Sequence, residues 1–376
     1  MANILDYLDW RGDIPMTEDT FNEIDGLILS QFVYLSYEGI IPKDLNRTIT
    51  IEEAGRRYFK RKRRSEEEES LTLQINNCSE VVRRMYRTER FRKLQVCGFV
   101  EQFDPATAKQ FAAVAVKISD ECVFIVFRGT DDSLAGWEED FKLCYMVPVE
   151  SQLAAKSYLQ ILCEEWNGRI MLGGHSKGGN LSIYAAMCLC DEYRERIARI
   201  YNYDGPGFLP SVVESEDYLK ILPLISSYLP QASMVGMIMY NESRCEIVKS
   251  VEKGFFQHKA VSWEVCGPHF VNAERFDKTS VWFNKACKKW VEEIDVDKRE
   301  IFIDHVFQLL KSAETDTLTE ISNGLPMVMN KVMRSYSDLD KDTRRMLKGI
   351  VKQMLKLSTQ TIKENHLIGS KNNDTK

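Results

Sequence analysis

The order of apolar and polar positions predicts strands that alternate with helices through the middle of the chain. Residues 111–119 (FAAVAVKIS) and 121–130 (ECVFIVFRGT) are rich in Val, Ile and Phe, and they predict two strands joined by a hairpin at Ser119 and Asp120. The pattern then predicts a helix over 150–166, a strand at RIMLGG, a helix at GNLSIYAAMCLC, a strand in IARIYNYDGPGF, a mostly helical stretch near 211–223, and strands over 232–240 and 245–251. This alternation predicts an α/β fold, with a mainly parallel sheet flanked by helices.

Both ends of the chain read as helical. Residues 20–35 carry apolar side chains at helical spacing, and Thr20 and Glu23 have the spacing of a capping box. From residue 296 onward the chain reads as amphipathic helices without intervening strands. We therefore expect a main domain over 1–295, which includes the N-terminal helical segment. A helical C-terminal extension over 296–366 and a disordered tail over 367–376 would follow.

Composition narrows the class of protein without deciding the function. The chain has 376 residues, of which 44% are hydrophobic and 28% charged, with a net charge of -6. These values are those of a globular protein, and nothing global predicts nucleic acid as a partner. The charge run over 56–69 (RRYFKRKRRSEEEE) is interpreted as a solvated segment, with nucleic-acid binding through 56–64 as the alternative.

The N-terminus lacks a signal-peptide pattern, and no apolar run approaches the ~18 residues that span a bilayer. The ten cysteines include no CxxC pair and predict reduced, mostly buried thiols. No cluster of Cys and His has the spacing of zinc ligands, so no metal is expected. Together these features predict a cytoplasmic protein without a transmembrane segment, and they leave the oligomeric state open.

The segment Gly174–Gly178 (GHSKG) fits the pattern G-x-S-x-G around Ser176. A strand before it and a helix after it predict a nucleophile elbow, in which the serine occupies a sharp turn. The alternative is a tight turn with an incidental serine. If Ser176 is a nucleophile, the backbone N–H of Lys177 is one expected oxyanion donor and that of Thr130, after the preceding strand, is the other. The Lys177 side chain is expected to face solvent, the alternative being a cation that favours an anionic substrate.

Five histidines are candidates for the base that would activate Ser176. His258 is favoured because it lies in the loop after the last predicted strand, where the base of such a site belongs. His269, eleven residues later, is the rival. His175 is excluded by its place beside the serine, and His305 and His366 are expected on the faces of the C-terminal helices.

Asp204 is the candidate acid, because it ends the strand that follows the helix after Ser176. A carboxylate there can hold the imidazole in the required tautomer. The alternatives are that Asp204 is only a turn residue, or that the site is a Ser-His dyad.

Two segments in this order, FRGTDDSLAGWEEDF and GGHSKGGNLSIYAA, resemble the class 3 (fungal-type) lipases of the α/β-hydrolase fold. The segments DYLDWRGDI, FNEIDGLILS, LPQASMVGMIM and GFFQHKAVSWEV resemble, more closely, the bacterial Mbeg1-like family of lipase-like proteins. The resemblance implies an α/β-hydrolase fold and a serine hydrolase that needs no cofactor and acts on a small-molecule or lipid acyl substrate. It also shows a departure, because the place of the usual class 3 acid is taken by 233–236 (SMVG), without a carboxylate.

We therefore expect a serine hydrolase that cleaves an ester or thioester through Ser176, His258 and Asp204, with Lys177 and Thr130 as oxyanion donors. The alternative is a lipase-like binding or scaffold module that kept the fold and lost efficient catalysis. The missing acid at Ser233 and the added helices favour that alternative.

Overall fold

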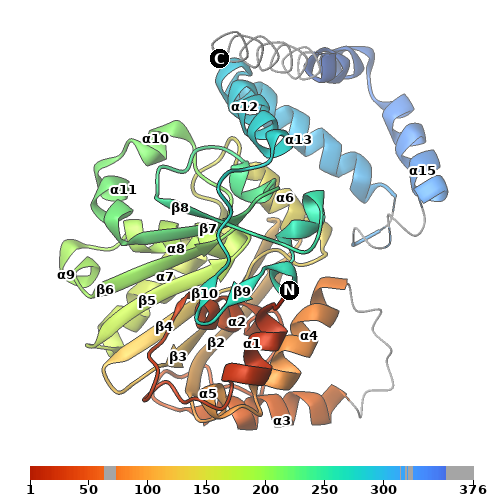
Figure 1. Cartoon of the computed structure of the whole chain (residues 1–376). Coiled ribbons are helices and arrows are strands. Elements are labelled where there is room, and N and C mark those ends of the chain that lie inside the picture. The colour runs from red at the N-terminus through yellow and green to blue at the C-terminus, as the bar shows by residue number, and fades with distance from the viewer. Residues whose placement is uncertain (63–72, 314, 318–319, 321–324, 353–376) are drawn as a thin grey trace, which may run out of the picture.

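The computed structural model describes residues 1–62, 73–313, 315–317, 320 and 325–352, and its centre is one sheet whose strands lie in sequence order (Figure 1). Strands β1 to β4 pair antiparallel, and β4 to β8 pair parallel. The predicted hairpin is confirmed as the β3–β4 pair. The strands are β1 (Ile49–Thr50), β2 (Gln95–Asp104), β3 (Lys109–Lys117), β4 (Cys122–Phe127), β5 (Arg169–His175), β6 (Ile197–Tyr203), β7 (Ile225–Pro230) and β8 (Cys245–Val248).

Helices cover both faces of the sheet because its central strands are apolar on both sides. On β3, Phe111, Ala113 and Ala115 pack into one cluster, and the alternate residues Ala112 and Val114 pack into the other. Burial on both faces explains why these strands read as continuous apolar runs. The first cluster includes residues of α7 (Glu150–Glu165), α8 (Lys177–Met187) and α11 (Glu216–Ile221), and the second includes residues of α1 (Ile4–Arg11), α2 (Glu23–Phe32), α3 (Ile51–Lys62) and α4 (Leu73–Met85).

Two sequence-based expectations about local structure are wrong. The segment 232–240 is not a strand, since it forms the 3₁₀ turn η2 (Val235–Met237) and Met239 has a φ of 62°, which a strand cannot accommodate. The strand at this place in the sheet is β7, whose Ser226 and Ser227 interrupt the apolar pattern. At the start of α2, Asn22 is the N-cap and forms the capping box with Asp25, in place of Thr20 and Glu23.

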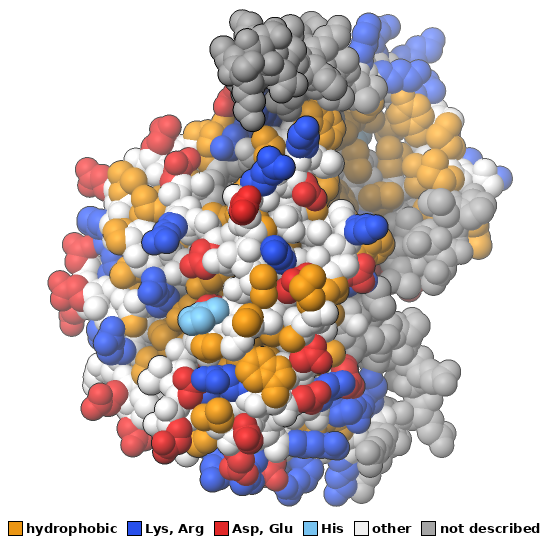
Figure 2. Space-filling view, in the orientation of Figure 1, with side chains coloured by type: hydrophobic (Ala, Val, Ile, Leu, Met, Phe, Trp, Pro, Cys, Tyr) orange, Lys and Arg blue, Asp and Glu red, His pale blue; other side chains and the backbone are white. Residues whose placement is uncertain are grey.

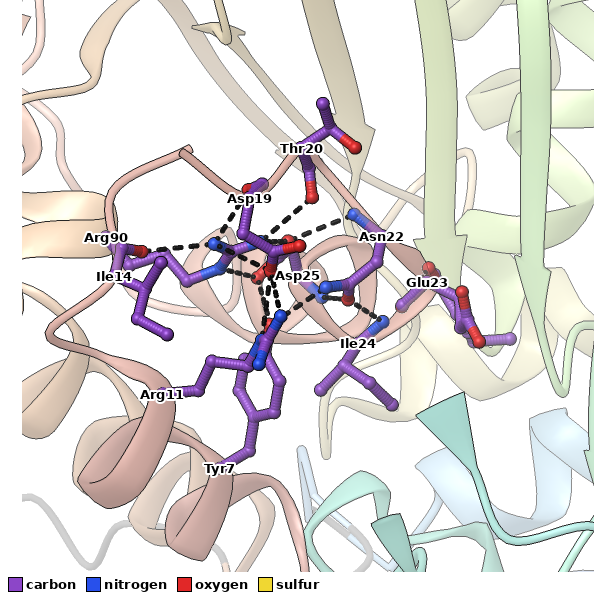
Figure 3. Close-up of polar contacts among 11 residues, drawn as sticks. Tyr7, Arg11, Ile14, Asp19, Thr20, Asn22, Glu23, Ile24, Asp25 and Arg90 are labelled. Atoms are coloured by element: carbon purple, nitrogen blue, oxygen red, sulfur yellow. Dashed lines mark hydrogen bonds and ion pairs between the residues drawn. The ribbon is translucent and has the colours of Figure 1, made fainter. Parts of the chain in front are cut away.

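A buried polar network fixes the N-terminal helices to the body of the protein (Figure 3). Arg90, on α5 (Glu89–Arg92), donates to Asp25 through Nη2 at 2.5 Å and through Nε at 2.7 Å. The Tyr7 hydroxyl donates to the same carboxylate at 3.0 Å. Burial raises the pKa of Asp25, and Arg90 opposes that rise. Because a buried charge without its partner is costly, this network holds α1 and α2 in one position on the body.

The helical C-terminal region is present and packs against α6 (Leu134–Lys142) (Figure 1). It contains α12 (Lys278–Glu293), α13 (Val296–Lys311) and α15 (Leu325–Asp338). Lys311 pairs with Glu138 at 2.5 Å, and the backbone of Asp316 accepts from the N–H of Leu134 at 2.8 Å. The predicted boundary at 295/296 falls at the N-cap of α13 and stays a prediction. The predicted tail over 367–376 lies outside the described residues.

Figure 2 shows acidic and basic side chains interspersed over one face of the molecule. In the charge run, residues 56–62 belong to α3, where Arg56 and Arg57 pair with Glu52 and Glu53, and residues 63–69 lie outside the described residues. None of the helices in the described ranges is both long and apolar enough to cross a bilayer.

The remaining helical elements connect the strands or follow the last of them. They are α9 (Asp191–Arg194), α10 (Pro210–Val213), η1 (Leu222–Leu224), η3 (Gly254–His258) and η4 (Ala260–Ser262). The helical stretch expected near 211–223 is therefore present as α10, α11 and η1. A separate two-stranded ribbon is formed by β9 (Val265–Cys266) and β10 (His269–Phe270).

Candidate active site

Ser176 occupies a strained turn between β5 and α8. Its backbone has φ 58° and ψ -134°, a combination that a residue other than glycine adopts only where the surroundings enforce it. The surroundings do so through close packing of the flanking glycines. A Cβ on Gly174 would lie 2.3 Å from the carbonyl carbon of Gly178, and one on Gly178 would lie 2.1 Å from the backbone oxygen of Phe127. The G-x-S-x-G spacing therefore permits a sharp strand-to-helix turn that places the serine at the carboxyl end of β5.

Asp204 and His258 meet beside Ser176, at the carboxyl ends of β5 and β6. Asp204 follows β6, the parallel neighbour of β5, and the N–H of Ser176 donates to the carbonyl of Tyr203 at 2.9 Å. His258 ends η3, and its Nδ1 lies 2.6 Å from Oδ2 of the fully buried Asp204. Since an ionised carboxylate only accepts, Nδ1 carries the proton and donates it, which leaves Nε2 with a free lone pair. This is the tautomer that a general base requires.

The segment that lacks the usual acid holds Asp204 in place. Ser233 donates its hydroxyl to Oδ1 of Asp204 at 2.5 Å, and the N–H of Gly236 donates to the same oxygen at 3.1 Å. One carboxylate oxygen is thereby occupied by the 233–236 segment, and the other is left for His258. The segment without the class 3 carboxylate thus contacts a carboxylate that follows the neighbouring strand β6, that of Asp204. The sequence alone did not predict this contact of Ser233.

The His175 side chain bonds to the backbone of His258. Its Nε2 lies 2.8 Å from the backbone oxygen of His258, so Nε2 donates, and Nδ1 is the acceptor that faces the Tyr34 hydroxyl at 3.2 Å. The two imidazole rings lie 4.5 Å apart between centroids. Burial, and secondarily the neighbouring His258, hold the pKa of His175 well below its ordinary value, so this ring is neutral. Tyr34, which lies just after α2, thereby contacts the residue that precedes Ser176.

In the part of the chain that the structure describes, His269 and His305 have partners other than Asp204. His269, the rival base, is on β10, where its side chain is 70% exposed and Nδ1 contacts Glu23 Oε1 at 2.8 Å. His305 is half-buried on α13, where Nδ1 contacts the carbonyl of Ile301 at 2.7 Å. His366 lies outside the described residues.

The described residues lack the serine–histidine hydrogen bond that a complete triad contains. Within the described ranges, neither Ser176 Oγ nor His258 Nε2 has a hydrogen-bond partner, and no hydrogen bond joins the two atoms. Such bonds are often long in free enzymes and tighten when substrate binds. The structure therefore brings the candidate acid and base together and places both beside the serine turn.

Thr130 and Lys177 place two backbone N–H groups near Ser176. A Cβ on Gly129 would lie 3.0 Å from Cβ of Ser176, so the loop after β4 touches the turn. In the described chain neither the N–H of Thr130 nor that of Lys177 has an acceptor. The Thr130 hydroxyl donates to Asp140 Oδ2 at 2.5 Å, which fixes the loop to α6. Both N–H groups are therefore available to an anion at this edge.

The Lys177 side chain is buried, so the expectation that it faces solvent is wrong. Its Nζ donates to Glu139 Oε2 at 2.7 Å and to the backbone and side-chain oxygens of Gln110 at 2.9 and 3.0 Å. Glu139 also accepts from the N–H and the hydroxyl of Ser151, at 2.7 and 2.6 Å. A lysine is tolerated in the interior when it is paired and hydrogen-bonded in this way. The ion pair joins the start of α8 to α6, β3 and α7.

We expect Lys177→Met to lower the free energy of unfolding by about 3–5 kcal/mol, because it leaves the Glu139 carboxylate buried without its cation. Urea unfolding followed by circular dichroism measures the change. The double variant Lys177→Met/Glu139→Gln is the control and should recover a large part of the loss, since it removes the unpaired charge. A single variant as stable as the wild type would contradict this assignment.

Asp140 should make stability fall as pH rises. Burial raises the pKa of its carboxyl to about 6, against the opposing effects of Lys177 and the Thr130 hydroxyl. Between about pH 4 and 6 the Asp140 carboxyl therefore keeps its proton in the folded protein but loses it in the unfolded chain. The free energy of unfolding gains from this difference at pH values below about 4, and the gain disappears as the pH rises to about 6. Asp140→Asn should flatten this part of the stability profile in urea titrations. An unchanged slope would count against the raised pKa.

The cysteines differ in their exposure to solvent. All ten cysteines are free thiols, but only Cys78, Cys97, Cys144 and Cys163 are buried, so the expectation of mostly buried thiols holds in part. Among the residues that the structure describes, no group of three or more His, Cys, Asp or Glu side chains could hold a metal ion.

Comparison with known proteins identifies the family. The family model described as Mbeg1-like matches residues 85–308, which is more than half of the chain. The chain belongs to the Mbeg1-like family. The matched part of this Mbeg1-like protein includes Thr130, Ser176, Asp204 and His258, whereas α1 to α3, α15 and Tyr34 lie outside it. A search of curated proteins gives no significant match.

Solved structures similar to the Mbeg1-like chain include fungal lipases. A fungal lipase in complex with an inhibitor is 13% identical, with a TM-score of 0.33, over 42% of this chain and 67% of the lipase. The native Rhizomucor miehei lipase propeptide complex is 15% identical, with a TM-score of 0.33, over 50% of this chain and 64% of that one. A deletion mutant of that complex is 14% identical, with a TM-score of 0.34, over 50% and 62%. The match spans about two thirds of each lipase.

The family match confirms the resemblance to Mbeg1-like proteins that the sequence motifs indicated. The expected fold class is confirmed as well, since the sheet is mainly parallel, helices flank it and a helical C-terminal region follows. The family match brings no substrate and no role for an individual residue.

Proposed function

We propose that this Mbeg1-like protein is a serine hydrolase that cleaves a carboxylic ester or thioester through an acyl-enzyme on Ser176. The observation that carries the proposal is the Asp204–His258 contact of 2.6 Å beside a serine held at φ 58°. Strained backbone persists where the surrounding structure enforces it, and it clusters at active sites. A buried carboxylate bonded to Nδ1 of a part-exposed histidine prepares that ring to accept a proton at Nε2.

The proposed reaction begins when Ser176 Oγ attacks the acyl carbon and His258 Nε2 takes the hydroxyl proton. Asp204 stabilises the imidazolium, and Ser233 and Gly236 keep the carboxylate oriented. The N–H groups of Lys177 and Thr130 stabilise the tetrahedral oxyanion, a contribution of about 3–4 kcal/mol per donor in comparable sites.

His258 then returns the proton to the leaving alcohol or thiol. Water, activated by the same nitrogen, releases the acid from Ser176. The proposed substrate is a small-molecule or lipid acyl compound, and the proposed mechanism requires no cofactor.

Labelling with a fluorophosphonate probe tests the proposal. The probe should form an adduct on Ser176, because only an activated serine reacts, and intact-protein mass spectrometry followed by peptide mapping identifies the site. His258→Ala should abolish labelling. The matched control is His269→Ala, which removes an exposed histidine that does not contact Asp204 and should label like the wild type. Equal labelling of both variants would contradict the role of His258.

The second candidate function is a lipase-like binding module with little catalysis. The observation that favours it is the absence of a Ser176–His258 hydrogen bond in the described chain. In that case the wild type would stay unlabelled under conditions in which a known serine esterase reacts completely.

A further inference from the structure

An exposed apolar loop lies next to the candidate base. In residues 251–259, which we call the Phe-Phe loop, the side chains of Val251, Phe255 and Phe256 are 53%, 50% and 57% exposed. Large aromatic side chains bury most of their area in ordinary folds, and two adjacent exposed ones form an apolar surface that water disfavours. The Phe-Phe loop carries His258, whose imidazole packs under the Phe255 ring with the centroids 6.2 Å apart.

The Phe-Phe loop is held rigidly although its side chains are exposed. Gln257 is buried beneath it, where its side chain accepts from the N–H of Ala232 at 2.7 Å and donates to the carbonyl of Glu252 at 2.9 Å. The backbone oxygen of Gln257 also accepts from the indole of Trp263 at 2.8 Å. An anchored turn loses little conformational entropy on binding, so its exposed phenylalanines are prepared for contact with a partner.

Basic side chains flank the aromatic pair. Lys253 precedes it and is exposed, and Lys259 follows it with Nζ 4.7 Å from the centre of the Phe256 ring. Lys249 is also exposed, and Glu252 is the acidic residue of the Phe-Phe loop. The local charge is therefore positive, although the whole chain carries -6. At physiological salt, charges more than about 8 Å apart are largely screened, so the local charge decides what this loop attracts.

We propose that the Phe-Phe loop docks the protein on an anionic phospholipid surface, with the phenylalanines in the lipid and the lysines at the headgroups. Exposed aromatic side chains beside lysines match the layered chemistry of that surface, which is apolar inside and negative at its edge. His258 lies in the same loop, so docking places the candidate catalytic edge at the lipid. The inference that the substrate is a membrane acyl lipid rests on the proposed function. The docking of the loop on the lipid surface does not depend on it.

Vesicle flotation tests the docking with the full-length Ser176→Ala protein, which cannot hydrolyse the lipid. The protein should float with phosphatidylcholine vesicles that contain phosphatidylglycerol, and much less with phosphatidylcholine alone. Val251→Ser/Phe256→Ser should weaken the association about tenfold, because it removes two of the apolar side chains and leaves Phe255 against His258. Lys253→Glu should weaken binding only to the anionic vesicles, and added salt should act in the same way.

The matched control is Leu219→Ser on α11, where the replaced side chain is 51% exposed and lies outside the Phe-Phe loop. It should bind like the parent, and circular dichroism should show all variants folded. The proposal is overturned if the parent fails to float, if both vesicle types bind equally, or if Leu219→Ser loses as much as the double variant. Hydrolysis of a water-soluble ester by the wild type reports on the proposed function separately, since that assay needs no vesicle.

Discussion

Replacing Ser176 with alanine is expected to lower kcat for a short-chain p-nitrophenyl ester by at least about a thousandfold. Without Oγ no acyl-enzyme forms, and what remains is the small contribution of the oxyanion donors and substrate binding. The fold should survive, because Ser176 makes no side-chain hydrogen bond within the described residues that the substitution would break. Steady-state kinetics and a thermal melt measure the two effects.

A second substitution separates chemistry from backbone strain. Ser176→Gly removes the same hydroxyl, but glycine adopts φ 58° without the steric cost that alanine retains there. It should be as inactive as Ser176→Ala, and about 1 kcal/mol more stable. Hydrolysis at the wild-type rate by either variant would remove Ser176 from the mechanism and favour the binding module.

Replacing Asp204 with asparagine is expected to lower kcat by about three to four orders of magnitude. Ser233 and Gly236 both donate to Oδ1, so they would hold the oxygen of the new amide on their side and turn its NH₂ toward His258. Nδ1 must then accept instead of donate, which places the proton on Nε2 and leaves no lone pair for the serine proton. Steady-state kinetics with a soluble ester measures the loss.

The control for Asp204→Asn is Ser233→Ala, which removes one donor to Oδ1 and leaves the carboxylate and the tautomer of His258 in place. Its effect on kcat should be about tenfold, well below that of Asp204→Asn, because a hydrogen bond to a charged group contributes about 1.5 kcal/mol at the low end of its range. If Asp204→Asn kept kcat within about threefold, the site would be a Ser-His dyad and Asp204 a turn residue.

The sequence predicted the parts of the fold that local pattern controls. Within the runs at 111–119 and 121–130, residues 111–116 and 122–127 are apolar at every position because both faces of β3 and β4 are buried, and the two runs form the predicted hairpin. The prediction of a strand over 232–240 failed because Ile238 and Met239 pack their side chains from an irregular turn into a cluster that includes residues of α12 and α13. Apolar composition does not distinguish such a turn from a strand.

For the site, motif and position along the chain indicated the serine turn and a small set of candidate partners. The glycines around Ser176, the order of Asp204 and His258 along the chain and the apolar strands before them follow from motif and position. Position in the loop after the last predicted strand favoured His258, with His269 left as the rival eleven residues later. The pairing of Nδ1 with Asp204 is a contact between two loops 54 residues apart, and no local pattern encodes it.

Which side chains support those partners depends on contacts that form only on folding. Ser233 stands where the usual class 3 acid is missing, and its hydroxyl donates to the candidate acid Asp204. Lys177 looked solvent-exposed, yet it is buried because Glu139 and Gln110 surround its ammonium group. Tyr34 lies far from the motif in sequence and bonds to His175. In each case the deciding quantity is the free energy of satisfying a buried polar group, and its partners come from distant elements that only folding brings together.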